Sequence, residues 1–352
     1  MADEKKTKIN KYFAAANGYS GFVSLFDKVF PSGELDRIYV LKGGPGTGKS
    51  SLMKKAAKAL AERGCDIDEI YCSSDPHSLD GIMARSNGKA VAIIDGTAPH
   101  ERDAKIPGAA DEIINLGDNW DTRFLTSQKE EIVELSAEKS KAYSAAYSYL
   151  KIAGACADFI FDVYRKIFNK TEAKTKAEFI FNNETFAMGK QQSYLTSSFG
   201  KYGHYKIDGL NFDYGKTVRV YGNDFSIGLF LDFFLKLLKD KGCAFVSFPS
   251  PLDFSHSDGI YIPSADLLIT TSLTGEINAD DFICQNSDTE RTRQAISLHR
   301  ESLEEAKRWF SIASDFHFRL EDIYRGAMNF EKNDEILSTK LNEIENILEK
   351  AR

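Results

Sequence analysis

The sequence predicts an α/β protein with two domains, each built on a parallel β-sheet that helices cover. Two observations support this fold class. Short apolar runs alternate with longer segments in which apolar residues recur at helical spacing. The second half of the chain also repeats features of the first, and 352 residues are enough for two separate hydrophobic cores.

The internal repeat consists of three pairs of similar stretches in the same order. The pairs are 64–82 with 242–260, 11–22 with 193–204, and 161–165 with 321–325, at offsets of 178, 182 and 160. A shared short motif would give one match, so three ordered matches indicate duplication of a whole domain. We expect domains at about 1–172 and 185–352, joined through a polar linker within 169–183 that leads into a short strand-like FIF.

The periodicity of the first half predicts its elements in order. They are a strand at 38–41, a helix at about 49–63, strands at 69–72 and 91–94, and a long helix at about 126–168. The second half ends in a further helical pattern, STKLNEIENILEKAR. We expect the long helices of both halves to form a layer that joins them.

The connection between the first of these strands and the following helix is rich in glycine. It reads Gly43, Gly44, Pro45, Gly46, Thr47, Gly48, Lys49, Ser50, Ser51 and fits the pattern G-x-x-x-x-G-K-[ST]. Glycines allow successive backbone N–H groups to point at one centre, and a helix N-terminus adds positive charge. We therefore expect a phosphate site in which Lys49 reaches the β- and γ-phosphates and Ser50 ligates Mg²⁺.

A carboxylate for the metal is expected at the end of a neighbouring strand. The run VAIID offers Asp95 after four apolar residues, so Lys49 and Asp95 are the candidate catalytic residues, and Ser50 and Asp95 the candidate metal ligands. The alternative is an ordinary turn aspartate before Gly96.

These residues resemble those of P-loop NTPases, and GGPGTGKSSL looks like the loop of AAA-type ATPases. The sequence departs from the AAA pattern at Gly96, where those ATPases place a water-activating Glu. The layout KGGPGTGKSSLMKK, CSSDPHSLDGI and IIDGTAPH also resembles a bacterial family of tandem P-loop ATPases. The resemblance implies two P-loop NTPase-like domains with ATP and Mg²⁺ as ligands. No guanine-binding signature stands out, which also favours ATP.

The second copy has lost the phosphate-binding residues. At the offset of 178, Gly48, Lys49 and Ser50 fall on Ser226, Ile227 and Gly228, and with a gap of two Asp95 falls on Thr271. We expect this copy to keep the fold as a scaffold, a regulatory domain or a surface for a protein partner.

Several other polar residues are weaker candidates. Asp75, Asp80 and Gly81 recur as Asp253, Asp258 and Gly259, which favours a role in folding, although Asp75 could instead act as a base. The remaining candidates flank the expected nucleotide: His77, Thr97, His100, Arg102, Trp120 and Arg123. For Arg102 a solvated surface position is the simpler interpretation, and for the segment around Trp120 packing between helix and sheet.

Three functions fit these observations. The first is an Mg-ATP-binding protein with slow or regulated hydrolysis; the second is a small-molecule or nucleoside kinase with Asp75 at its acceptor; the third is a nucleotide sensor that does not hydrolyse ATP. The net charge of -7 gives no general attraction to nucleic acid. No long apolar run predicts a membrane span or signal core, so we expect a cytoplasmic protein with reduced, mostly buried cysteines.

Overall fold

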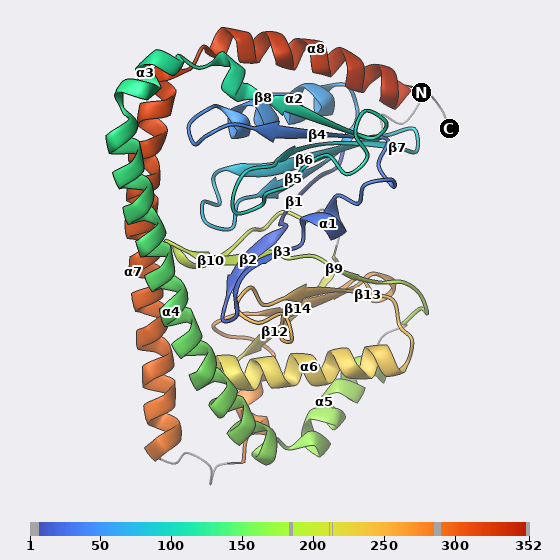
Figure 1. Ribbon diagram of the computed structural model, residues 1–352. Helices are drawn as coiled ribbons and strands as arrows, with labels where there is room; N and C mark the ends of the chain where they lie inside the picture. Colours follow the sequence, from blue (N-terminus) through green and yellow to red (C-terminus); the bar gives the residue numbers. More distant parts are fainter. Residues whose placement is uncertain (1–6, 183–185, 211, 213, 285–289, 350–352) are drawn as a thin grey trace.

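The computed structural model describes residues 7–182, 186–210, 212, 214–284 and 290–349. Two six-stranded sheets lie one above the other, beside two long helices that run past both of them (Figure 1). Within the described residues no helix is both long enough and apolar enough to cross a membrane.

The first sheet contains mostly parallel strands but is mixed. Its order is β1 (Ile9–Phe13), β5 (Asp66–Tyr71), β6 (Leu79–Ser86), β7 (Lys89–Asp95), β4 (Arg37–Lys42) and β8 (Asp111–Asn115). β6 is antiparallel to both neighbours, so the expected purely parallel sheet is wrong. Asn87 and Gly88 turn the β6–β7 hairpin with φ values of 50° and 75°, as an Asn-Gly turn requires. α2 (Lys49–Glu62) packs on this sheet.

The second sheet has the same order of strands and the same directions. Read from the corresponding edge, it contains β9 (Gln191–Ser193), β13 (Phe245–Pro249), β14 (Ser257–Ile262), β15 (Leu267–Thr271), β12 (Lys216–Tyr221) and β16 (Ile277–Asn278). β14 is its antiparallel strand. α6 (Asp224–Asp240) packs on this sheet in the way that α2 packs on the first.

Two small hairpins lie between the sheets. They are β2 (Ala15–Gly18) with β3 (Gly21–Ser24), followed by the short α1 (Phe26–Val29), and β10 (Ser197–Gly200) with β11 (Gly203–Lys206). Short 3₁₀ turns, Leu116–Asn119, Pro263–Ala265 and Ala279–Phe282, join other elements.

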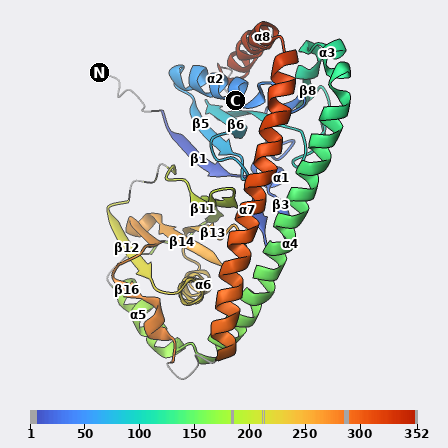
Figure 2. The same ribbon diagram turned by 90° about the vertical axis from the view of Figure 1, so that its left-hand side faces the viewer.

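The long helices form the side wall of the molecule. α4 (Lys129–Ile167) and α7 (Glu290–Ala327) pack side by side along both halves (Figure 2), and the short α3 (Thr122–Ser127) precedes α4. The expected long helix at 126–168 is therefore confirmed. Small and large apolar side chains alternate along the contact, among them Ala146, Leu150, Ala306 and Phe310.

The helix that ends each half packs on the sheet of the other half. α5 (Lys170–Asn182) places Ala173, Ala177 and Phe181 in the core of α6 and the second sheet. α8 (Phe330–Glu349) places Leu337, Ile344 and Leu348 in the core of α2 and the first sheet.

This exchange of helices corrects the expected linker. The predicted polar linker and FIF strand at 169–183 form α5 instead; residue 169 precedes the helix, and residue 183 lies outside the described residues. Apolar residues at helical spacing, Ala173, Ala177, Ile180 and Phe181, give α5 the face that it buries. Of the cysteines, Cys65, Cys156 and Cys243 are buried as expected, Cys72 is partly buried and Cys284 is exposed.

Candidate functional site

The glycine-rich loop lies between β4 and α2, as the sequence predicts. Its six connecting residues, 43–48, follow the buried β4 and precede Lys49, the first residue of α2. Gly46 and Gly48 have φ values of 70° and 87°, a conformation that other residues adopt only with strain. The loop therefore depends on its glycines for its backbone path into the helix.

Lys49 and Asp95 lie together at the carboxyl edge of the first sheet. Lys49 Nζ donates hydrogen bonds of 2.9 Å to the carbonyl oxygens of Gly43 and Gly44 and lies 3.7 Å from Asp95 Oδ2. Asp95 ends β7, the parallel neighbour of β4, and its Oδ1 accepts hydrogen bonds of 2.8 and 2.6 Å from the backbone N–H and hydroxyl of Thr97. Burial raises the pKa of the Asp95 carboxyl, and the Lys49 ammonium opposes this shift.

The Ser50 hydroxyl faces the start of β6. Its Oγ accepts a hydrogen bond of 2.9 Å from the backbone N–H of Leu79 and keeps a further lone pair. The described residues contain no group of three or more His, Cys, Asp or Glu side chains that could hold a metal by themselves. Ser50 and Asp95 offer only oxygen atoms, which suits Mg²⁺ held mainly by phosphate and water.

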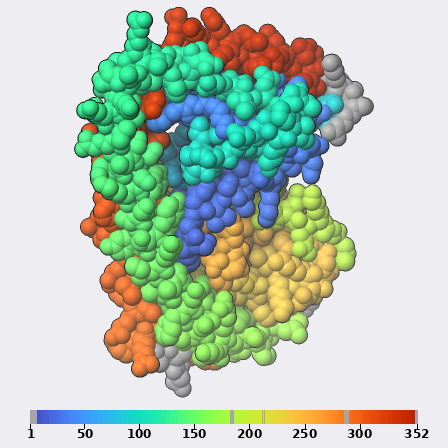
Figure 3. Space-filling view, in the orientation of Figure 1, coloured from blue at the N-terminus to red at the C-terminus, as the bar shows by residue number. Residues whose placement is uncertain are grey.

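The ends of two helices from the second half cover the loop. A Cβ added to Gly44 would lie 2.9 Å from the Tyr324 ring, and one added to Gly46 would lie 2.4 Å from the carbonyl oxygen of Glu321. Asn333 of α8 donates a hydrogen bond of 2.9 Å from Nδ2 to the Thr47 carbonyl oxygen. The loop glycines are thus required for close packing as well as for conformation. Figure 3 shows a narrow opening in the surface between α4 and blue residues of the first half.

The Glu321 carboxylate of α7, beside the loop, lies close to two basic side chains. Glu321 Oε1 lies 3.4 Å from His317 Nε2, and its other oxygen lies 3.6 Å from Arg325 Nη2. His317, and more weakly Arg325 and Lys49, lower the pKa of the Glu321 carboxyl. This contact could not be predicted from the sequence, because the covering residues are some 280 positions from the loop.

The corresponding connection in the second half is shorter. Only Gly222 and Asn223 lie between β12 and α6, where the first half has six residues. The alignment of Lys49 with Ile227 is therefore wrong, because Ile227 is a buried residue in the first turn of α6, and Asp224 begins that helix. The alignment without gaps did not detect that the connection before α6 is four residues shorter than the glycine-rich loop, because the apolar pattern of α6 fits either alignment.

A carboxylate occupies the start of α6. Asp280 accepts hydrogen bonds of 3.0 and 3.2 Å from the backbone N–H of Asn223, and the Ser226 hydroxyl donates to its Oδ1. The N-terminus of a helix attracts anions, and here a side chain of the protein supplies one. Thr271 has the same sheet register as Asp95, opposite the penultimate residue of the adjacent strand, so this part of the alignment is confirmed.

His100 and Arg102 lie in the interior. His100 Nε2 is 2.9 Å from Asp80 Oδ2, and its ring stacks on Phe26 with 4.4 Å between centroids. Arg102 is only 6% exposed and donates a hydrogen bond of 2.7 Å to Ser32 Oγ. The expectation of a solvated surface Arg102 is therefore wrong.

Asp75 and its counterpart Asp253 have matching roles in turns. The Asp75 carbonyl oxygen accepts from Ser78 N at 2.9 Å, and that of Asp253 accepts from His256 N at 3.1 Å. The side chain of Asp253 also accepts from Ser255 N at 2.9 Å. Their retention in both halves is explained by the fold, as expected.

Three other candidates lie outside the immediate surroundings of Lys49. His77 is exposed beside the Tyr202 ring, at 5.8 Å between centroids, and Arg123 is exposed on α3. Trp120 packs against Tyr324 with ring centroids 5.8 Å apart, which joins it to the cover of the loop. Packing, the default interpretation for this segment, is thus confirmed for Trp120.

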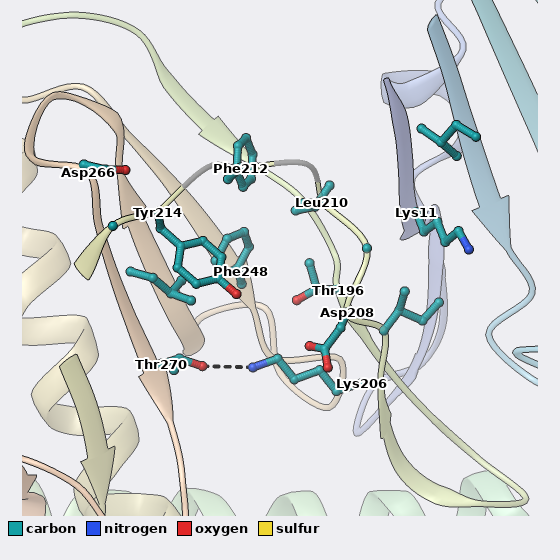
Figure 4. A pocket seen from close by; sticks show the side chains of 15 residues that line it. Lys11, Thr196, Lys206, Asp208, Leu210, Phe212, Tyr214, Phe248, Asp266 and Thr270 are labelled. Atoms are coloured by element: carbon teal, nitrogen blue, oxygen red, sulfur yellow. Dashed lines mark hydrogen bonds between the residues drawn. The ribbon is translucent and has the colours of Figure 1, made fainter. Parts of the chain in front are cut away.

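A cavity of about 800 Å³ lies away from this site, between the first strand of one sheet and the face of the other. Lys11, Lys206, Phe212, Tyr214 and Phe248 are among its lining residues (Figure 4). Lys206 Nζ donates a hydrogen bond of 2.9 Å to Thr270 Oγ1 across it. None of the loop residues lines this cavity, so its volume says nothing about the phosphate site.

Comparison with protein-family models, curated proteins and solved structures returned no match for this chain. The geometry of the loop and its surroundings is therefore the basis for the function proposed below.

Proposed function

We propose that the first half of the chain is a P-loop NTPase domain that binds Mg-ATP through residues 43–51. One observation supports this most strongly: Lys49 Nζ, at the N-terminus of α2, lies 3.7 Å from Asp95 at the end of the adjacent parallel strand. A magnesium nucleotide requires a lysine for its phosphates and a carboxylate near its metal, and these two residues place both groups in one site. On binding, Lys49 exchanges the carbonyl oxygens of Gly43 and Gly44 for phosphate oxygens.

Each residue has a defined task in this proposal. Backbone N–H groups of the loop and the positive end of α2 bind the phosphates. Ser50 Oγ and Asp95 would hold Mg²⁺, which when bound would neutralise charge on the phosphates. Lys49 orients the phosphates.

Hydrolysis by such a site is slow or regulated. A Cβ added to Gly96 would lie 2.3 Å from Val40 Cγ1 and 2.9 Å from the carbonyl oxygen of Arg102. A Glu that activates water could not follow Asp95 unless the Val40 side chain and the backbone at Arg102 moved. The site therefore supports binding and phosphate positioning better than rapid attack by water.

The two halves are duplicated domains close to the expected copies at 1–172 and 185–352, with α5 extending the first copy to Asn182. Identical strand order, matching strand directions and equivalent hairpins support this origin. The second copy is degenerate, since its connection before α6 is short and Asp280 lies at the helix start. It serves as a scaffold or regulatory domain, because α7 and α8 cover the loop of the first copy.

Turnover of labelled ATP by excess protein, followed over hours with and without hydroxyl-bearing small molecules, tests this function. We expect slow release of phosphate that needs Mg²⁺, does not depend on an acceptor and is lost in Lys49→Ala. Turnover only in the presence of an acceptor would instead identify a kinase. Binding without any turnover would identify a nucleotide sensor.

A further inference from the structure

The hairpin of each half contacts a loop at the carboxyl ends of the strands in the other half. At the tip of β2–β3, a Cβ added to Gly18 would lie 3.1 Å from the carbonyl oxygen of Pro251, in the loop after β13. At the tip of β10–β11, a Cβ added to Gly200 would lie 3.3 Å from the carbonyl oxygen of Ser73, in the loop after β5. The two contacts occupy equivalent positions in the two halves. A side chain that differs between them is therefore a candidate for a role in the phosphate site, because the fold alone does not require it.

Lys201 follows Gly200 and is largely buried against that edge. Its side chain is 11% exposed, and Nζ lies 3.6 Å from Asp75 Oδ1 and 3.2 Å from Ser314 Oγ. The ammonium also lies 4.5 Å from the centre of the Phe318 ring on α7. A buried ammonium group is stable only when such partners surround it. Lys201 therefore links Asp75, in the loop after β5, to Ser314 and Phe318 of α7.

The counterpart of Lys201 carries no charge. Tyr19 occupies the same place in the other hairpin, and its hydroxyl lies 2.8 Å from His299 Nε2. Burial lowers the pKa of His299 to about 4, so this contact is uncharged at neutral pH. Asp253, the counterpart of Asp75, therefore has no lysine from the hairpin, and the His256 ring lies 3.9 Å away. Within the part of the chain that the structure describes, this ammonium–carboxylate pair is found at the edge with the glycine-rich loop and not at the equivalent edge of the second sheet.

A short path connects this pair to the candidate metal ligand. Asp75 begins a turn in which Ser78 N donates 2.9 Å to the Asp75 carbonyl oxygen. The next residue, Leu79, donates its backbone N–H to Ser50 Oγ at 2.9 Å. A shift of the Asp75 turn would therefore move the donor that orients the Ser50 hydroxyl.

We propose that Lys201 is a positioning residue of the nucleotide site, supplied to the first half by the second. It fixes the Asp75 turn, and through Leu79 it orients the Ser50 oxygen towards the metal of the nucleotide. Affinity for the metal-bound nucleotide thereby depends on contact between the halves. This inference rests on the proposed binding of Mg-ATP.

The test is calorimetric titration of the full chain with ATP, once with Mg²⁺ and once with EDTA. Partners that orient a metal ligand typically contribute about 10- to 100-fold to metal affinity. We expect Lys201→Met to weaken Mg-ATP binding by about that factor and to leave binding in EDTA unchanged, with Lys201→Arg between Lys201→Met and wild type. Tyr19→Phe, at the equivalent position of the other hairpin, should leave both affinities unchanged.

The outcomes separate this inference from the function on which it rests. No binding of Mg-ATP by the wild type would overturn the proposed function. Binding by the wild type, with equal effects of Lys201→Met in Mg²⁺ and EDTA or with no effect, would overturn the role of Lys201 alone. Should Lys201→Met fail to fold, Asp75→Asn provides the same comparison, because it removes the partner charge and keeps the side-chain shape.

Discussion

Asn333 Nδ2 donates a hydrogen bond of 2.9 Å to the backbone carbonyl oxygen of Thr47, which joins the last helix to the glycine-rich loop. The Asn333 side chain is buried, and its Oδ1 accepts a hydrogen bond of 2.9 Å from Asn119 Nδ2. Because both polar ends of the amide are satisfied, one side chain fixes the loop, the segment after β8 and α8 relative to one another.

Replacement of Asn333 by Ala tests this connection. The change removes the hydrogen bonds that Asn333 makes to the Thr47 carbonyl and the Asn119 amide, so the free energy of unfolding should fall by about 1–3 kcal/mol. Binding of Mg-ATP should weaken because the loop loses its support. Denaturant unfolding and calorimetry measure both effects. Asp334→Ala is the control, since its exposed ion pair with Lys55 should contribute less than about 1 kcal/mol. Unchanged stability and affinity in Asn333→Ala would refute the connection.

The exchange of helices predicts that a residue of α8 stabilises the first sheet. Ile344 is fully buried in the core that contains Leu52 and Ile93. Ile344→Ala should lower the free energy of unfolding by about 2–5 kcal/mol, because it leaves a cavity in that core. Leu298→Ala, at a position 48% exposed on α7, should change stability much less. Equal effects of the two substitutions in denaturant unfolding would contradict this packing.

Asp280 should matter for stability and not for nucleotide binding. Asp280→Ala leaves the Asn223 N–H without this acceptor, which should cost about 1–3 kcal/mol, while the Ser226 hydroxyl keeps the Asn223 carbonyl oxygen as an acceptor. The affinity for Mg-ATP should match that of the wild type, because the phosphate site is in the other half. A large loss of affinity, measured by calorimetry on folded protein, would contradict the assignment of the site to the first half.

The raised pKa of Asp95 predicts the pH dependence of binding. A carboxyl with a raised pKa takes up its proton at a higher pH than an ordinary Asp as the solution is acidified. The protonated form cannot pair with Lys49 and is a poor metal ligand. Mg-ATP affinity should therefore fall on acidification from neutral pH, by more than it falls in Asp95→Asn. That variant reports the titration of the nucleotide itself, so parallel pH profiles for the two proteins would refute the role of Asp95.

The local residue pattern was sufficient to predict the strand, loop and helix that build the phosphate site, because they are contiguous in the sequence. The strand before the loop, α2 after it and Asp95 at the end of β7 were all predicted, because buried strands and a glycine-rich connection have distinctive residue patterns. β6 was missed although Asn87-Gly88 is a strong hairpin signal between two apolar runs.

The contacts between the two halves could not be predicted from the sequence. The apolar face of an amphipathic helix shows that α5 and α8 are buried, but not which sheet they cover. For the same reason nothing predicted that Tyr324 and Asn333 would lie on the loop. The shortened connection before α6 was hidden because an apolar helix pattern fits several alignments equally well.

We propose one competent nucleotide site in this chain, in its first half. Calorimetric titration with Mg-ATP tests it most directly, using the wild type, Lys49→Ala and the matched control Lys58→Ala, whose side chain is 79% exposed on the same helix. We predict one mole of nucleotide per mole of chain for the wild type and for Lys58→Ala, and no measurable binding for Lys49→Ala. Two moles per chain, or unchanged affinity in Lys49→Ala, would rule out a single site at the glycine-rich loop.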